Sequence, residues 1–248
     1  MFHHALAATA SLVALAFALS TYERWLARRR PHELAWSIAL AMFSLAAILL
    51  GLGNAVGWSS ATFRLYFFFG AIANVPFLAL GTLYLLGGKR VGDRAAAVIA
   101  LFVAFSAGVL AVEPFTRPLA PHVLVPRAAE VFGPLPRVLA AVASGGGALV
   151  VFGGAAWSAV RYRRGRMVAA NVLIALGTAI LSASGLLNGL ADAMTAFMVT
   201  LAVGITVIFA GFLVASSGPA PPATAAMPVE AAGEAPSRPR LAAVRQQN

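Results

Sequence analysis

Long apolar runs separated by short polar segments dominate the sequence. A helix needs about 20 mainly apolar residues to cross a hydrocarbon core about 30 Å thick. Seven runs meet this requirement, with charged side chains only at their ends: 5–22, 34–53, 63–86, 95–112, 137–160, 167–190 and 193–214. The runs are continuous and do not alternate as transmembrane strands do. The pattern predicts an all-α, polytopic bundle of seven transmembrane helices within residues 1–215.

The composition leads to the same class. The chain is 60% hydrophobic and only 10% charged, whereas soluble domains carry about 25% charged residues. A soluble enzyme, a nucleic-acid-binding module and a disordered protein are excluded, because no soluble fold of this length hides so much apolar surface. The net charge of +10 comes from the loops, and no basic stretch interleaved with aromatic residues indicates nucleic acid as a partner.

Basic residues favour alternate loops. One side of the predicted bundle holds only Arg64, Arg117, Arg127 and Arg137. All other basic residues fall on the opposite side, in segments 23–33, 87–94 and 161–166 and in the C-terminal tail. Because cytoplasmic loops are rich in Lys and Arg, we expect the N-terminus outside and the C-terminus in the cytoplasm. No Lys or Arg precedes the first run, which is therefore expected to be a retained helix and not a signal peptide.

Two segments outside the runs have their own character. Segment 113–136 on the outer side holds six prolines, which prevent a continuous helix. Pro126 can open a short helix over 127–132 that Gly133 stops, so we expect a cap on the outer surface. Residues 216–248 are rich in Pro and Ala and are predicted to form a disordered cytoplasmic tail.

Asn74 is the most prominent polar residue inside a predicted span. It follows Phe63 by 11 residues, which places it about 16 Å along a helix, near the middle of the membrane. Pro76 removes a backbone N–H and frees a carbonyl one turn earlier. The amide either links two helices by a hydrogen bond, as polar residues in membranes often do, or contributes to a ligand-binding or gating site.

A second group of polar residues lies at the outer helix ends. Its members are Arg64, Glu113, His122, Asn188 and Asp192. They are candidates for the lining of an outward-facing ligand-binding vestibule, and the alternative is simple solvation of helix ends. If Asp192, Glu113, Glu130 and His122 converged within hydrogen-bond reach, a membrane enzyme acting on lipid would become the better interpretation.

No cofactor or metal is expected. The chain has no Cys, and His3, His4, His32 and His122 all lie outside the predicted spans, where they cannot ligate a haem between helices. No catalytic constellation lies at membrane depth, so a non-enzymatic protein is predicted. Gly185 and Gly189 form a GxxxG pattern that favours close helix packing, within the chain or in a homodimer.

Several short motifs carry a family resemblance. They are Gly57-Trp58-Ser59, Phe63-Arg64-Leu65-Tyr66, Gly70, Asn74-Val75-Pro76 and Leu80-Gly81-Thr82-Leu83-Tyr84-Leu85. With the seven-helix topology, they resemble uncharacterised multi-pass proteins of actinobacteria and the seven-helix sensor modules of bacterial histidine kinases, the kinase part being absent. The resemblance implies a module of the bacterial cytoplasmic (inner) membrane.

Two functions remain open from the sequence. The first is a non-enzymatic, receptor-like or scaffolding module that binds a small apolar ligand, a membrane lipid or a partner helix. The second is a facilitative transporter of a neutral or apolar molecule, with Pro76 and the glycines of 145–147 as flexible elements. A water-accessible cavity at Asn74 would favour the transporter, and a dry, packed centre would favour the first.

Overall fold

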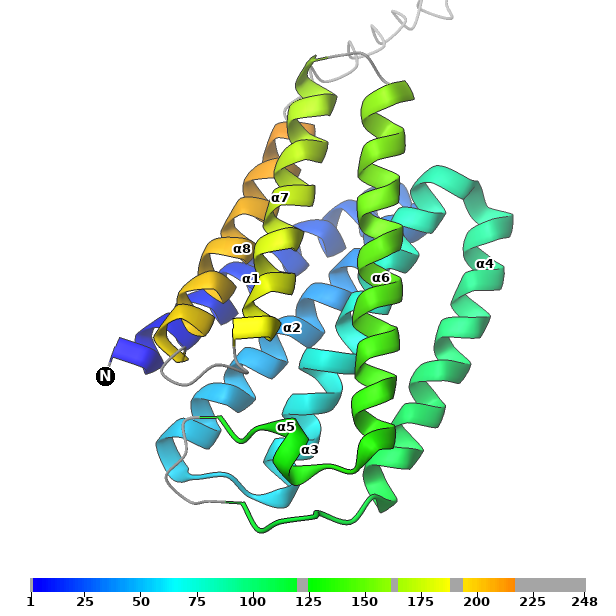
Figure 1. Ribbon diagram of the computed structural model, residues 1–248. Coiled ribbons are helices and arrows are strands. Elements are labelled where there is room, and N and C mark those ends of the chain that lie inside the picture. The colour runs from blue at the N-terminus through cyan, green and yellow to red at the C-terminus, as the bar shows by residue number, and fades with distance from the viewer. Residues whose placement is uncertain (1, 120–124, 162–164, 188–193, 217–248) are drawn as a thin grey trace, which may run out of the picture. The chain divides into compact units, whose positions relative to one another are not determined.

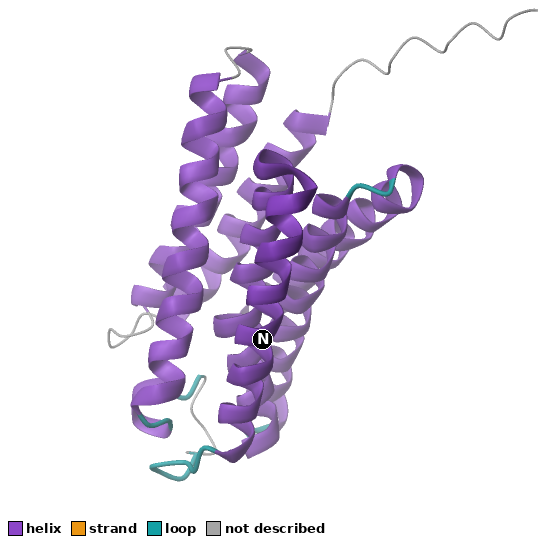
Figure 2. Cartoon of the chain, turned by 90° about the vertical axis from the view of Figure 1, so that its right-hand side faces the viewer, coloured by secondary structure: helices purple, strands orange, loops and turns teal. Residues whose placement is uncertain are grey.

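In the computed structural model, residues 2–119, 125–161, 165–187 and 194–216 are described. The regular elements of these residues are all helical (Figure 2). They are α1 (Phe2–Arg28), α2 (Pro31–Val56), α3 (Ser60–Phe67), the π-helix η1 (Phe68–Ala73), α4 (Asn74–Val112), α5 (Ala128–Val131), α6 (Pro134–Arg161), α7 (Gly165–Leu187) and α8 (Met194–Ser216). The predicted tail lies outside the described residues.

Three helical stretches among the described residues are long and apolar enough to cross a membrane. They are Pro31–Val56, Ser60–Val112 and Pro134–Ser158. Shorter apolar helices cover Val168–Leu181 and Val199–Gly211. The all-α class and the membrane character predicted from the sequence are therefore confirmed.

The junction between the third and fourth predicted runs differs from expectation. A loop was expected at 87–94, but helix continues through it except at Gly88, whose φ of 74° and ψ of −178° break the helix. Space for a Cβ is open there, so the backbone angle and not crowding calls for glycine. Beyond the bend the chain returns, because Leu110 near the end of α4 accepts a hydrogen bond from Arg64 of α3.

The helices contact one another in a closed order. Helix α1 packs on α2, and α2 packs on both η1 and α4. Both η1 and α4 pack on α6. Helix α6 packs on α7, α7 packs on α8, and α8 packs back on α1. Figure 1 lets the reader follow this circuit, with α6 in front of α2 and the second half of α4 at the edge.

Hydroxyl groups join α1 to α2. Ser11 Oγ and Ser44 Oγ lie 2.9 Å apart, and Ser44 Oγ also donates to the Ser11 carbonyl at 3.1 Å. Two turns away, Ser37 Oγ donates to the Ala18 carbonyl at 2.9 Å. The pairs 11–44 and 18–37 show that the two helices run antiparallel.

Glycines join α6 to α4. A Cβ at Gly147 would lie 2.6 Å from Val75 Cγ1 and 3.1 Å from the Val75 carbonyl oxygen. A Cβ at Gly154, two turns further, would lie 2.5 Å from Thr82 Cγ2. Both contacts advance together along the two helices, so α6 runs parallel to the first half of α4. Only residues without a side chain allow so close an approach.

An aromatic cluster anchors the cap, which we define as residues 113–119 and 125–133. Phe63 of α3 stacks on Phe132 with ring centroids 5.4 Å apart, and Phe115 meets Phe132 edge-on at 5.4 Å. Thr116 binds back through its amide to the Val131 carbonyl and through its hydroxyl to the Glu130 carbonyl. The short helix predicted over 127–132 is present as α5, which covers Ala128–Val131, and the placement of the cap on the outer surface stays a prediction.

Candidate functional site

The helix that carries Asn74 is irregular just before it. Residues Phe68–Ala73 form the π-helix η1, and Pro76 follows within the next turn. Since Pro76 has no N–H, a carbonyl one turn earlier lacks its usual donor. Short π-helical segments of this kind are frequent at functional sites.

Neighbouring helices supply donors to this irregular stretch. Ser144 Oγ of α6 donates to the Ala71 carbonyl at 3.0 Å. Trp36 Nε1 of α2 donates to the Leu78 carbonyl at 3.2 Å, and its ring covers Gly81. Hydrogen bonds from α6 on one side and from α2 on the other therefore hold this irregular stretch of helix in place.

Asn74 lies between these two attachments. On a helical wheel, Gly70 and Gly81 face α2, Ala71 and Val75 face α6, and Asn74 falls between the two faces. The residue is 9% exposed, and its Oδ1 is buried with no hydrogen-bond partner among the described residues. The amide oxygen therefore makes none of the described helix-to-helix links. The ligand-binding role of Asn74 stays a prediction.

Arg64 has a structural role at the end of α4. Its guanidinium donates to the carbonyls of Leu110 and of Glu113, the latter at 2.6 Å. The same group lies 4.4 Å from the ring centroid of Phe115. The last carbonyls of a helix have no intrahelical donor, so Arg64 satisfies them and ties α3 and α4 to the cap.

Glu113 meets Arg64 only through its main chain. Its half-buried carboxylate faces Gly133, where a Cβ would overlap Oε1. Glu130 lies with Arg127 at 3.4 Å. The structure therefore brings Arg64 and Glu113 together, as expected for one end of the bundle, but Asn74 lies ten residues further along the same chain, about 15 Å away.

Four predicted positions cannot be placed. They lie outside the described residues and are His122, Asn188, Gly189 and Asp192. The contacts of Gly185 also lie outside what the structure describes. Among the described residues, no three His, Asp or Glu side chains gather as metal ligands would.

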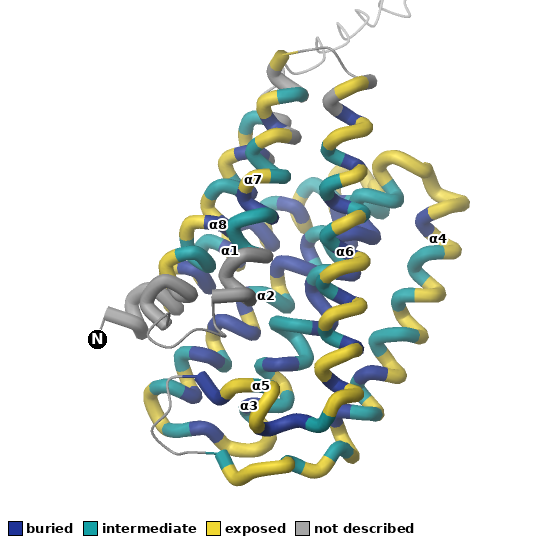
Figure 3. The backbone as a smooth tube through the Cα atoms, in the orientation of Figure 1, coloured by how far each residue is buried: buried dark blue, intermediate teal, exposed yellow. Residues whose placement is uncertain are grey.

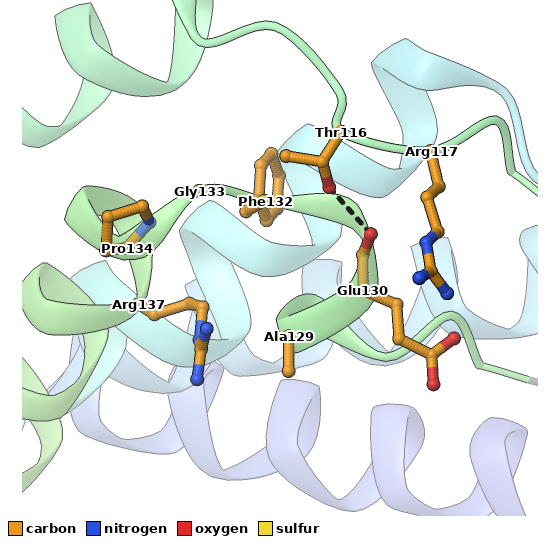
Figure 4. Close-up of a pocket in the computed structure, with 8 residues that line it drawn as sticks. All are labelled: Thr116, Arg117, Ala129, Glu130, Phe132, Gly133, Pro134 and Arg137. Atoms are coloured by element: carbon orange, nitrogen blue, oxygen red, sulfur yellow. Dashed lines mark hydrogen bonds between the residues drawn. The ribbon is translucent and has the colours of Figure 1, made fainter.

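A groove of about 380 Å³ lies between the cap and the start of α6, and the sequence analysis did not predict it. It is lined by Thr116, Arg117, Ala129, Glu130, Phe132, Gly133, Pro134 and Arg137. Figure 4 shows the guanidinium groups of Arg117 and Arg137 on either side of α5, with the Glu130 carboxylate on the side of Arg117. The only signal in the sequence was the recurrence of arginines in the outer segment, where Arg117, Arg127 and Arg137 outnumber Glu113 and Glu130.

A buried carboxylate at the opposite end was also missed. Glu33 is 2% exposed, and its Oε1 lies 3.7 Å from Arg24 Nε. Its other oxygen has no hydrogen-bond partner among the described residues. A signal existed, because Glu33 continues the buried face of α2 at helical spacing from Ser37, Leu40 and Ser44.

Burial perturbs the groups around this carboxylate. His32, in the segment before the predicted span 34–53, has its pKa lowered chiefly by desolvation, which the nearby Glu33 partly opposes. The pKa of Arg24 is lowered by desolvation as well, again opposed by Glu33. The His32 ring meets Trp36 edge-on at 5.3 Å. This end of the α1–α2 pair therefore disfavours additional positive charge.

Comparison with known proteins adds no further identification: no protein-family model matches the chain, and no curated protein or solved structure matches it.

Proposed function

We propose that this chain is a seven-helix integral membrane protein of the bacterial inner membrane, with the cap and N-terminus outside and the C-terminus in the cytoplasm. Two helix directions support it. The antiparallel α1 and α2 are successive spans, and the parallel first half of α4 and α6 are spans three and five. The basic residues of segments 23–33, 87–94 and 161–166 support the orientation.

The bundle acts as a non-enzymatic, receptor-like module that binds a mainly apolar small molecule at Asn74. The observation that carries this proposal is the buried, unpartnered Asn74 Oδ1. A buried polar atom without a partner costs about 1–3 kcal/mol. A ligand hydroxyl or amine that donates to Oδ1 recovers this energy, while the surrounding apolar helices take the rest of the ligand.

Native mass spectrometry of the full chain in a mild detergent tests this function. We expect a discrete additional mass on the wild type that Asn74→Leu loses without a lower unfolding temperature, since the described residues make no hydrogen bond to Oδ1 that the substitution would remove. Asn54→Leu is the matched control, because both amide atoms of Asn54 are also buried and unpartnered among the described residues, but Asn54 lies in the last turn of α2 and not beside the π-helix and Pro76. It should keep the mass.

Two results would overturn the ligand role. One is an additional mass that survives Asn74→Leu. The other is a loss of about 0.6–2 kcal/mol of stability on Asn74→Leu, the range measured for hydrogen bonds between membrane helices. The first result would place the ligand elsewhere, and the second would make Asn74 a link between helices.

Facilitative transport is the second candidate, favoured by the π-helix and Pro76 beside Asn74. The absence of Cys from the sequence makes it testable with a single introduced thiol. A membrane-impermeant maleimide should label Asn74→Cys from both sides of the membrane if the protein is a transporter. The receptor-like module predicts no labelling, because Asn74 is shielded by α2 and α6.

The same chemistry tests the topology. Ser59→Cys, before α3, should react only from outside, and Arg90→Cys, after the Gly88 bend, only from the cytoplasm. A reporter fused after Asn248 should be active in the cytoplasm. Periplasmic activity at that position would contradict the seven-span arrangement.

A further inference from the structure

The four basic residues on the cap side of the chain have unequal surroundings. Arg64 binds the carbonyls at the end of α4, and Arg127 lies 3.4 Å from Glu130. The side chains of Arg117 and Arg137 make no hydrogen bond or ion pair with the rest of the described chain. Both line the groove beside the cap. The groove therefore has two cationic side chains available for an anion.

The start of α6 adds to this positive character. Helix α6 begins at Pro134, which lines the groove, and its first turn carries no acidic residue. In that turn the N–H groups of Leu135 and Arg137 lack intrahelical acceptors and carry partial positive charge, whereas Pro134 and Pro136 have no N–H. The one acidic residue in the groove lining, Glu130, is offset by Arg127.

Below Arg137 the free face of α6 is apolar. Val138, Val142 and Leu149 are 55%, 58% and 75% exposed. Between them lies exposed Gly145, where nothing approaches within 4 Å of a Cβ position. Figure 3 shows exposed positions recurring along this helix. From Arg137 to Leu149 the rise is about 18 Å, close to the thickness of one leaflet of a core about 30 Å thick.

We infer that the groove binds the phosphate of an anionic phospholipid from the leaflet on the cap side. Arg137 at the start of α6 binds the phosphate, Arg117 on the other side of α5 adds electrostatic attraction, and an acyl chain lies along α6 past Gly145. A soluble anion would account for the arginines but not for the apolar track that continues from them. The site is separate from Asn74 and does not depend on the ligand proposed there.

Native mass spectrometry of the full chain titrated with dioleoylphosphatidylglycerol measures this binding. Near a membrane surface each Arg contributes about 1 kcal/mol toward an anionic lipid, which is about fivefold in affinity. The double variant Arg117→Gln/Arg137→Gln should therefore bind the lipid about 25-fold more weakly. The control Arg28→Gln/Arg90→Gln removes two exposed arginines of the opposite end and should bind as the wild type does.

A second variant guards against loss of folding. Glu130→Gln removes the only carboxylate from the groove lining and frees Arg127, so binding of the same lipid should strengthen severalfold. Weaker binding by Glu130→Gln would overturn the inference. So would equal binding by the double variant and its control, equal binding of dioleoylglycerol, which lacks the phosphate, or complete displacement of the lipid by millimolar inorganic phosphate.

Discussion

Helices α1 and α2 meet through hydroxyl groups, whereas α6 meets the first half of α4 through glycines. In the first pair, the hydroxyls of Ser11 and Ser44 lie within hydrogen-bond distance of each other, and each hydroxyl also donates to the carbonyl of the other residue. In the second, Gly147 rests on the backbone of Val75. Lipid gives helices no hydrophobic reason to associate, so both hydrogen bonds and close packing serve instead.

The comparison also separates structural polar residues from functional ones. The serine hydroxyls between α1 and α2 have hydrogen-bond partners, and their role is to hold these two helices together. Asn74, beside the glycine contact, is buried, and its oxygen has no partner among the described residues. Where glycines already bring two helices together, a polar side chain is not needed for association, and this is why we propose a binding role for Asn74.

The largest effect is expected from Gly147→Leu. The new side chain would overlap Val75, including its backbone, which cannot move aside as a side chain can. Overpacking typically costs about 1–3 kcal/mol, and we expect the upper end, measured by thermal unfolding in detergent. Gly145→Leu is the control, because that position is open. A similar loss in both variants would show that helix flexibility, and not the contact with α4, requires glycine here.

The hydroxyl pair should give a smaller effect. Hydrogen bonds between membrane helices average about 0.6 kcal/mol, with a maximum near 1.7. Ser11→Ala and Ser44→Ala should each cost about this much, and a double-mutant cycle should show that the two losses are not additive. Thr206→Ala removes an exposed hydroxyl that binds only its own helix and should be nearly neutral. Additive losses would mean that the two serines act independently.

The sequence predicted helix type and approximate location well, because the apolar runs 34–53 and 137–160 are long and unambiguous. It predicted the cap and its short helix from the spacing of prolines and Gly133. It did not predict the bend confined to Gly88, because polar residues at 87–94 indicate a loop, although Lys89 donates to Asp93 within a continuing helix. Local composition reports solvent exposure and not whether the helix is interrupted.

The site was harder to predict, because its polar residues differ in their partners and not in their type. Arg64 and Arg137 both begin apolar runs, yet one caps α4 and the other lines a groove. Glu33 stands among basic residues and is nevertheless buried in α2. Which charges are free depends on contacts between segments far apart in the chain, such as Arg64 with Leu110, and no local pattern encodes these contacts.

The smallest expected effect is a pH dependence at the end of the α1–α2 pair. Burial lowers the pKa of His32 below its usual value of 6.5. The unfolded chain therefore takes up a proton at a higher pH than the folded one. Stability linked to His32 is complete above pH 6.5 and is lost as the pH falls through the lowered pKa of the folded state.

The unfolding temperature of the wild type should accordingly fall more between pH 7 and pH 5 than that of His32→Gln. Since His3, His4 and His122 are unchanged in the variant, the difference between the two curves isolates His32. Identical curves would mean that protonation of His32 does not lower the stability of the folded protein. The interface that the serine hydroxyls join between α1 and α2 would then end before His32.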